Sequence, residues 1–229
     1  MKRPAAWLLM AVALLACGRL NAAGLLLIDA GHGGSDLGVK APDFQEAAAV
    51  LEIAKRLQSQ LKAAGIESAL TRSDASAGPT LSERATLANA SGARAYLSLH
   101  INFSPSAQAK GARIFFPRGL SSAPAAATAG LLAWDKAASS RAAEARALAQ
   151  QLALSLSAPD SGKASVQNLN LAPFRGLRLP AVLVELDFAS NPASLARLKS
   201  EEFRKTLSQR LVQGIKAWAA TLPPSGVAP

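Results

Sequence analysis

The sequence is poor in cysteine and in aromatic residues. Cys17 is the only cysteine among 229 residues, and aromatic side chains make up 5%. A single cysteine excludes a disulfide framework within the chain, and so few aromatic side chains disfavour a surface that stacks nucleic-acid bases. The formal charge is +10, yet the lysines and arginines form no dense block. We therefore expect no nucleic-acid partner, although the charge favours an anionic setting.

The sequence also lacks an apolar run of the roughly 20 residues that a membrane-spanning helix needs. Its first apolar run, residues 7–16, follows Lys2 and Arg3 and precedes the small residues Ala22 and Ala23. This order is typical of a secretory signal peptide, which we place at residues 1–23. The alternative is a membrane anchor that stays in place. We predict an exported protein of the periplasm or cell envelope.

Cys17 lies within this leader, in the segment Leu14-Leu15-Ala16-Cys17-Gly18. The segment is similar to a lipoprotein cleavage box, except that Leu15 is bulkier than usual at its position. Lipidation at Cys17 would anchor the protein to a membrane, and we expect contact with a membrane only in that case. Cleavage near Ala23 would instead leave a chain without cysteine.

Strand-like and helix-like stretches alternate along the rest of the chain. Short apolar runs typical of buried strands occur at 25–30, 68–71, 95–100, 112–116 and 181–186. Helical spacing of apolar residues occurs at 46–64, 80–90 and 202–222, and an alanine-rich helical region extends up to about residue 157. This alternation predicts an α/β single domain over 24–222, with a mostly parallel central sheet, helices on both faces and a flexible tail at 223–229. Residues 118–140 form either a surface loop or a lid over a site.

The two histidines of the sequence each fall at the end of a predicted strand. His32 follows the first strand within a glycine-rich turn, and His100 closes the third strand. Carboxyl ends of strands are where α/β sheets bind ligands. Catalytic zinc sites commonly use two histidines and one carboxylate. Glu46, which opens the first helix, is the natural third ligand; alone, it would be interpreted as an acid that complements the helix dipole.

A fourth polar residue, Glu185, ends the last apolar strand. A carboxylate in such a strand is costly to leave without a partner, so it requires a metal, a water or a cation nearby. A glutamate close to zinc can accept the proton of the attacking water. Asp29, three residues before His32, either orients a ligand or caps the turn.

These residues belong to a longer series of motifs that resembles one family. The motifs are residues 28–34 (IDAGHGG), Glu46 before 51–54 (LEIA), 70–72 (LTR), 81–84 (LSER) with Ala88-Asn89, 98–102 (SLHIN), 180–185 (PAVLVE) and 190–192 (SNP). In this order they are similar to the zinc-dependent N-acetylmuramoyl-L-alanine amidases of bacterial cell walls, also called type 3 amidases. The resemblance runs from Leu25 to about Trp218.

The resemblance implies one Zn²⁺ per chain, held by His32, Glu46 and His100, with Glu185 as the catalytic glutamate. It implies that Asn102 lies close to the metal and contacts substrate. The implied substrate is peptidoglycan, with a protein activator as a further possible partner and wall turnover or cell separation as the process. The chain departs from the family at Ala30, at Ala47 with Ala48, and at Asp187, which adds a carboxylate close to Glu185.

Three alternatives remain beside this interpretation. A zinc peptidase that cleaves wall peptides would use the same residues. A wall-binding module without catalysis is disfavoured because the four residues expected to act in catalysis are all present, namely His32, Glu46, His100 and Glu185. Dinucleotide binding through Gly31 and Gly33 fails because the fingerprint needs a third glycine where this chain has Asp36.

Overall fold

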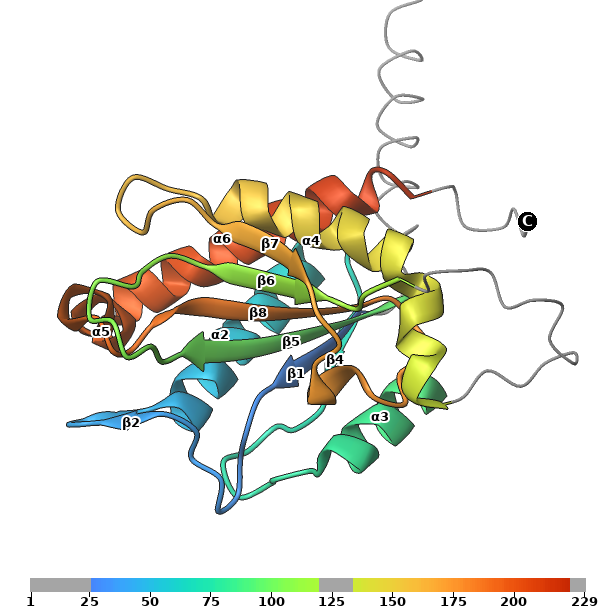
Figure 1. The fold of residues 1–229 in the computed structure, drawn as a ribbon, viewed down its shortest axis with the longest axis horizontal. Coiled ribbons are helices and arrows are strands. Elements are labelled where there is room, and N and C mark those ends of the chain that lie inside the picture. The colour runs from blue at the N-terminus through green and yellow to red at the C-terminus, as the bar shows by residue number, and fades with distance from the viewer. Residues whose placement is uncertain (1–25, 120–133, 223–229) are drawn as a thin grey trace, which may run out of the picture.

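The computed structural model describes residues 26–119 and 134–222. At its centre is a six-stranded sheet with the order β4-β1-β5-β8-β6-β7 (Figure 1). Its strands are β1 (Leu26–Ala30), β4 (Ser68–Leu70), β5 (Ala95–Asn102), β6 (Arg113–Phe116), β7 (Ser165–Asn168) and β8 (Ala181–Phe188). A separate hairpin pairs β2 (Lys40–Ala41) with β3 (Phe44–Gln45).

The sheet is mostly parallel, as the alternation of elements predicts. Strand β1 pairs in parallel with both β4 and β5, and β5 pairs in parallel with β8. Only β6 runs antiparallel to its neighbour β8, while β7 is parallel to β6. The carboxyl ends of β1, β5 and β8 therefore meet at one edge, and this edge carries the candidate site.

Helices cover both faces of the sheet, which confirms the predicted α/β layers (Figure 1). One face is covered by α2 (Glu46–Ala63), α4 (Ala142–Leu156), α5 (Pro192–Lys199) and α6 (Glu201–Ala219). The other face carries the shorter elements α3 (Leu81–Ala90), η2 (Trp134–Arg141) and η3 (Ala172–Phe174). The helices of the described ranges include none with the length and apolarity of a membrane span.

The strand pattern explains why both faces need cover. Successive side chains point to opposite faces, so Ile28 packs under α2 while Leu27 packs toward α3. All five residues of β1 are buried, and the first five of β5 are buried as well. These continuous apolar runs are stable only between two layers of helices.

The predicted boundaries agree with the structure within a few residues, and several short elements were not foreseen. The capping box opens α3 as expected: the Thr80 hydroxyl accepts from the Glu83 amide at 3.3 Å, and the Glu83 carboxylate accepts from the Thr80 amide at 2.7 Å. The hairpin, β7 and α5 were missed because each is short. The predicted signal peptide, Cys17, the tail and the greater part of residues 118–140, expected as a loop or a lid, lie outside the described residues.

A β-bulge in β8 gives Asp187 a structural function. His100 pairs with Glu185 but Asn102 pairs with Phe188, so β8 has one residue more than β5 over this interval. The fully buried Asp187 carboxylate accepts from the Gly111 amide at 3.0 Å, from Ser194 Oγ at 2.9 Å and from Arg197 at 2.8 Å. The carboxylate that stands close to Glu185 in sequence is thus occupied in anchoring α5 and the Gly111 turn.

Candidate metal centre

Three side chains from separate elements converge at the carboxyl edge of the sheet. His32 follows β1, Glu46 opens α2 and His100 lies in β5. Glu46 Oε1 lies 3.0 Å from His32 Nε2 and 3.0 Å from His100 Nδ1, and the two ring nitrogens are 3.2 Å apart. The three form a cluster that can hold a metal ion.

The spacing of these three atoms fits a zinc ion. Zinc binds nitrogen and oxygen at about 2.0–2.1 Å in a tetrahedron, whose ligand atoms are then about 3.3 Å apart. The observed separations of 3.0 to 3.2 Å are close to that edge. The two imidazole rings stand at 80° to each other, so their nitrogens approach one point from different directions.

The electrostatics of the cluster keep Glu46 ionised. Burial by itself raises the pKa of Glu46, but hydrogen bonds from His100, His32 and the backbone amides of Val39 and Ile101 outweigh it and lower the pKa to about 2. The hydrogen bond to Glu46 raises the pKa of His32 to about 9, against the effect of burial and with a further contribution from Asp36. The carboxylate thus attracts positive charge, which a metal cation can supply in place of a proton.

The backbone around His32 is shaped for close approach. His32 has φ of 59°, a left-handed conformation that few residues other than glycine adopt. A Cβ atom added to Gly31 would overlap the imidazole of His100. A Cβ atom on Gly38 would stand 2.6 Å from Glu46 Oε2. The glycines of this turn therefore allow three ligands from distant parts of the chain to meet.

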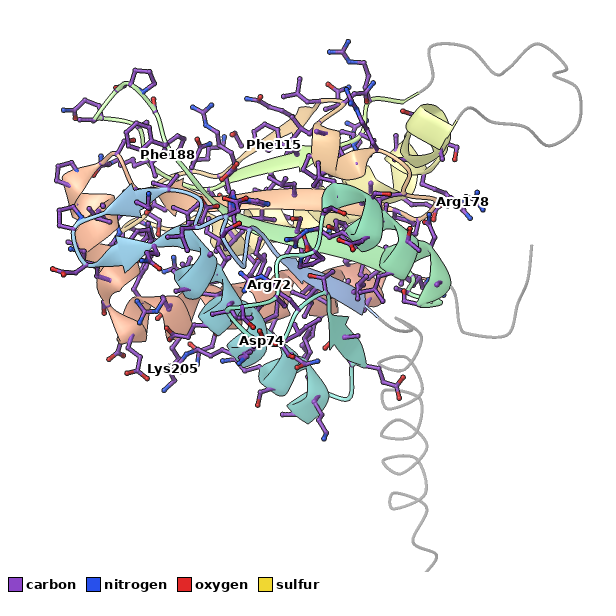
Figure 2. All side chains as sticks on the ribbon, turned by 90° about the horizontal axis from the view of Figure 1, so that it is seen from below. Arg72, Asp74, Phe115, Arg178, Phe188 and Lys205 are labelled. Carbon is purple, nitrogen blue, oxygen red and sulfur yellow. The ribbon has the colours of Figure 1, made fainter. Side chains whose placement is uncertain are left out.

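Two buried arginines hold the backbone that carries His32. Arg72, 3% exposed, donates to the carbonyl oxygens of Ala30 at 2.9 Å and Gly31 at 2.9 Å. Arg84, 5% exposed, donates to the carbonyl oxygen of His32 at 2.6 Å. Figure 2 labels Arg72 over the middle of the fold and Lys205 at its lower edge. Buried guanidinium groups satisfied in this way fix the path of the turn.

Asp29 also stabilises the backbone turn that carries His32. Its buried carboxylate pairs with Arg84 and accepts from Thr71 Oγ1 at 2.6 Å and Ser98 Oγ at 2.7 Å. Burial raises the pKa of Asp29, but Arg84 and the hydroxyl groups prevail, so the pKa lies below its ordinary value. Asp29 therefore acts on the turn through Arg84, since its hydrogen-bond and ion-pair partners among the described residues include none of His32, Glu46 and His100.

Asp36 contacts His32 directly. From the sequence alone, Asp36 served only to exclude a dinucleotide site. Its Oδ2 lies 2.8 Å from His32 Nδ1, and its Oδ1 accepts from the Gly38 amide at 3.0 Å. Such a carboxylate fixes the tautomer and orientation of a metal-binding histidine. The signal that could have found it is an acid four residues after a histidine within one glycine-rich turn.

Glu185 lies beside the cluster, directly across from His100 on the neighbouring strand. Its Oε2 is buried and has no hydrogen-bond partner among residues 26–119 and 134–222. Burial raises the pKa of Glu185 to about 7, with Glu46 adding to the rise and His100 opposing it. A carboxylate with a pKa near neutrality can take up and release a proton under physiological conditions.

Asn102 lies two residues beyond His100 in the same strand. Its backbone carbonyl accepts from the Ala189 amide at 2.9 Å, which ties the end of β5 to the end of β8. The Asn102 side chain is half-buried and does not belong to the three-residue cluster.

A cavity of about 440 Å³ adjoins the two histidines on the side of α3. Asp29 and Arg84 lie in its lining, together with Pro79, Leu81 and Pro173. A larger hollow of about 810 Å³ lies over α2 and β4, but no member of the metal-binding cluster lines it. The chemistry of the side chains, and not the volume, thus identifies the site.

Comparison with known proteins gives a consistent result. Residues 26–217 match the family described as N-acetylmuramoyl-L-alanine amidase. The N-acetylmuramoyl-L-alanine amidase AmiC of Neisseria meningitidis is 30% identical over 230 residues, which cover 89% of this chain and 55% of that protein. The amidase AmiA of Escherichia coli is 30% identical over 216 residues, covering 83% of this chain and 74% of AmiA.

A solved structure shows the same fold. The N-acetylmuramoyl-L-alanine amidase from Clostridium difficile 630 superposes with a TM-score of 0.70 at 24% identity, covering 86% of this chain and 97% of that one. The chain spans little more than half the length of the Neisseria relative. The likeness is therefore to the folded region that these proteins share.

Proposed function

The chain belongs to the N-acetylmuramoyl-L-alanine amidase family, and we propose on this basis that it hydrolyses the amide between N-acetylmuramic acid and L-alanine in peptidoglycan. One observation carries the proposal. His32, Glu46 and His100 converge within 3.2 Å of one another, and the buried Glu185 stands opposite His100 on the next strand.

The proposal includes one zinc ion per chain, held by His32 Nε2, Glu46 Oε1 and His100 Nδ1. When bound, zinc would polarise the amide carbonyl and lower the pKa of the attacking water. The donor set supports zinc because two imidazoles and one carboxylate leave a fourth position for water. Asp36 would hold His32 in the tautomer that presents Nε2 to the metal.

Glu185 is the proposed general base and acid. Its free Oε2 can accept a proton from the attacking water and then donate that proton to the departing alanine nitrogen. With its pKa near 7, the group populates both protonation states at neutral pH. Asn102, at the end of the strand that carries His100, is proposed to hydrogen-bond the substrate beside the scissile amide.

A peptidase that cuts within wall peptides would use the same four residues, so the test must identify the bond. Purified protein is incubated with peptidoglycan, and the released fragments are identified by mass spectrometry with and without a zinc chelator. Stem peptides with a free N-terminal L-alanine are the expected product, abolished by chelation and restored by zinc. Fragments cut within the peptide would establish the peptidase instead.

The matched variant separates catalysis from metal binding. We expect Glu185→Gln to retain one zinc per chain by elemental analysis while the rate falls by about 100- to 10,000-fold. His100→Ala should lose both metal and activity. A Glu185→Gln enzyme with undiminished activity would remove this residue from the mechanism.

Export is a separate part of the proposal. The relatives that the chain matches include cell-wall amidases by name, and peptidoglycan lies outside the cytoplasm. Fractionation of cells that produce the full chain, with N-terminal sequencing, should find a product processed near residue 23, or lipid-modified at Cys17. A protein activator remains a prediction, to be tested by the basal rate of the purified protein.

A further inference from the structure

The two sides of the metal centre differ in charge. On the side of α3, the 440 Å³ cavity is lined by the carboxylates of Asp29 and Asp36. Arg84 also lines it and forms an ion pair with Asp29, so these two charges offset each other. Asp36 remains exposed at the rim, since 65% of its side chain is accessible. Because the Asp36 carboxylate stands at this rim, this side of the site disfavours a carboxylate group of a substrate.

The opposite side carries a cation, Arg113, at the start of β6. In the strand register, the backbone of Arg113 lies opposite that of Glu185, and the backbone of Glu185 lies opposite that of His100. The three residues therefore form one row across β6, β8 and β5. Residues directly opposite each other in neighbouring strands point to the same face of the sheet. Arg113 therefore stands on the face of the site, one strand beyond Glu185.

The Arg113 side chain is held in place but keeps its charge available. Its guanidinium lies over the Phe188 ring, 5.0 Å from the centroid, and Phe188 is labelled in Figure 2. Arg113 is exposed, and it forms no ion pair with any residue of 26–119 or 134–222. Arg197, by contrast, is neutralised by Asp187. An arginine stacked on an aromatic ring presents its outer N–H groups in a fixed plane, which suits a carboxylate.

We propose that Arg113 binds the α-carboxylate of the second stem-peptide residue and so directs the peptide toward β6, with the uncharged acetamido sugar on the side of the α3 cavity. This inference rests on the proposed function, because it assigns the two halves of that substrate. The walls of Pro79, Leu81 and Pro173 suit the C–H faces of a sugar. Carboxylates of the peptide would meet Asp36 if the substrate lay the other way.

The dimensions agree with this orientation. Neighbouring strands lie about 4.8 Å apart, so the Arg113 backbone starts about 10 Å from that of His100. An extended peptide advances about 3.3 Å per residue, which places the α-carboxylate of the second stem residue about 7 Å from the scissile amide. The arginine side chain can span the remaining distance.

The test compares two substrates that differ by one charge. N-acetylmuramoyl-L-alanyl-D-glutamate has a free α-carboxylate, and its α-amide, the D-isoglutamine form, does not. We expect the native protein to prefer the free acid, and Arg113→Gln to raise its KM for that acid about tenfold while leaving the KM for the amide unchanged. Arg113→Glu should reverse the preference. The matched control is Arg146→Gln on α4, an exposed arginine that should alter neither KM.

The outcomes separate this inference from the proposed function. Cleavage of both substrates with equal KM values, unaffected by Arg113→Gln, would overturn the inference and leave the amidase intact. Cleavage of neither substrate, or of the peptide bond alone, by the zinc-loaded native protein would overturn the amidase itself. Equal loss of kcat for both substrates in Arg113→Gln would make Arg113 a residue that supports Glu185, and the inference would again fail.

Discussion

Gly31 packs directly against the imidazole of His100, so closely that any side chain at position 31 would overlap the ring. Gly31 directly follows β1, His100 lies in the neighbouring strand β5, and the Gly31 amide donates to the Leu99 carbonyl at 3.1 Å. The absence of a side chain at Gly31 therefore sets the position of His100, one of the three proposed metal ligands.

We expect Gly31→Ala to weaken zinc binding by at least about tenfold, because His100 must move away from Glu46. Overpacking of this kind also costs about 1–3 kcal/mol of stability. Competition with a chromogenic chelator measures the affinity. The control is Gly65→Ala, whose φ of +73° strains the backbone but whose Cβ would meet nothing within 4 Å. Equal zinc affinity in the two variants would contradict the close contact.

Asp36 is the second position where metal affinity should respond. Asp36→Asn removes the charge that faces His32 Nδ1 at 2.8 Å, and the loss of such a partner typically lowers metal affinity about 10- to 100-fold. Thermal stability without metal should change little, since the side chain is 65% exposed. Calorimetric titration with zinc measures the effect, and Asp43→Asn in the β2–β3 turn is the control that should bind zinc normally.

Glu185 should make the stability of the metal-free protein depend on pH. Its pKa is raised from 4.5 to about 7 by burial, so the folded state binds this proton more tightly than the unfolded state. The stabilisation is complete below pH 4.5 and is lost as the pH rises through about 7. Glutamine at this position does not titrate. The free energy of unfolding of Glu185→Gln, relative to that of the native protein, should therefore be about 1–3 kcal/mol higher at pH 8 than at pH 4. Urea denaturation at both pH values tests this, and a difference that does not vary with pH would contradict the buried, unpaired carboxylate.

Arg84 should matter for both stability and metal binding. Lysine at this position keeps the charge but cannot donate to Asp29, Ala30 and His32 together, so Arg84→Lys should lower the free energy of unfolding by about 2–4 kcal/mol. Zinc affinity should fall with it, because the His32 carbonyl is released. Arg56→Lys alters two ion pairs at the surface and should cost under about 0.5 kcal/mol in the same urea titration. A result in which both variants are equally stable would show that the turn does not depend on Arg84.

Part of the site could be predicted from residue type and order. The two histidines follow apolar strand runs, and the carboxyl ends of parallel strands share one edge, so their meeting was expected. Glu46 was expected beside them because the helix that follows the first strand starts at that edge. These predictions needed only the period of the apolar residues and the rule that strands of this kind lie parallel.

Asp36 and Asp187 illustrate what residue order could not reveal. Asp36 meets His32 only because the backbone of residue 32 takes a left-handed conformation and folds the turn back. Asp187 is directed away from Glu185 by a bulge in β8, and no periodic pattern announces one extra residue. Both depend on local dihedral angles that a sequence pattern does not specify.

The layers of the fold, the family and the types of side chain at the site could be predicted from residue order, because apolar periodicity and ordered motifs are properties of the chain. The way in which those side chains are held depends on long-range contacts that form only in the folded protein. Arg72 and Arg84 donate hydrogen bonds to the His32 turn from 41 and 52 residues away in the sequence. Arg113 lies opposite Glu185 because β6 runs antiparallel to β8. Contacts over such separations follow from packing and strand register, which are decided when the whole sheet assembles.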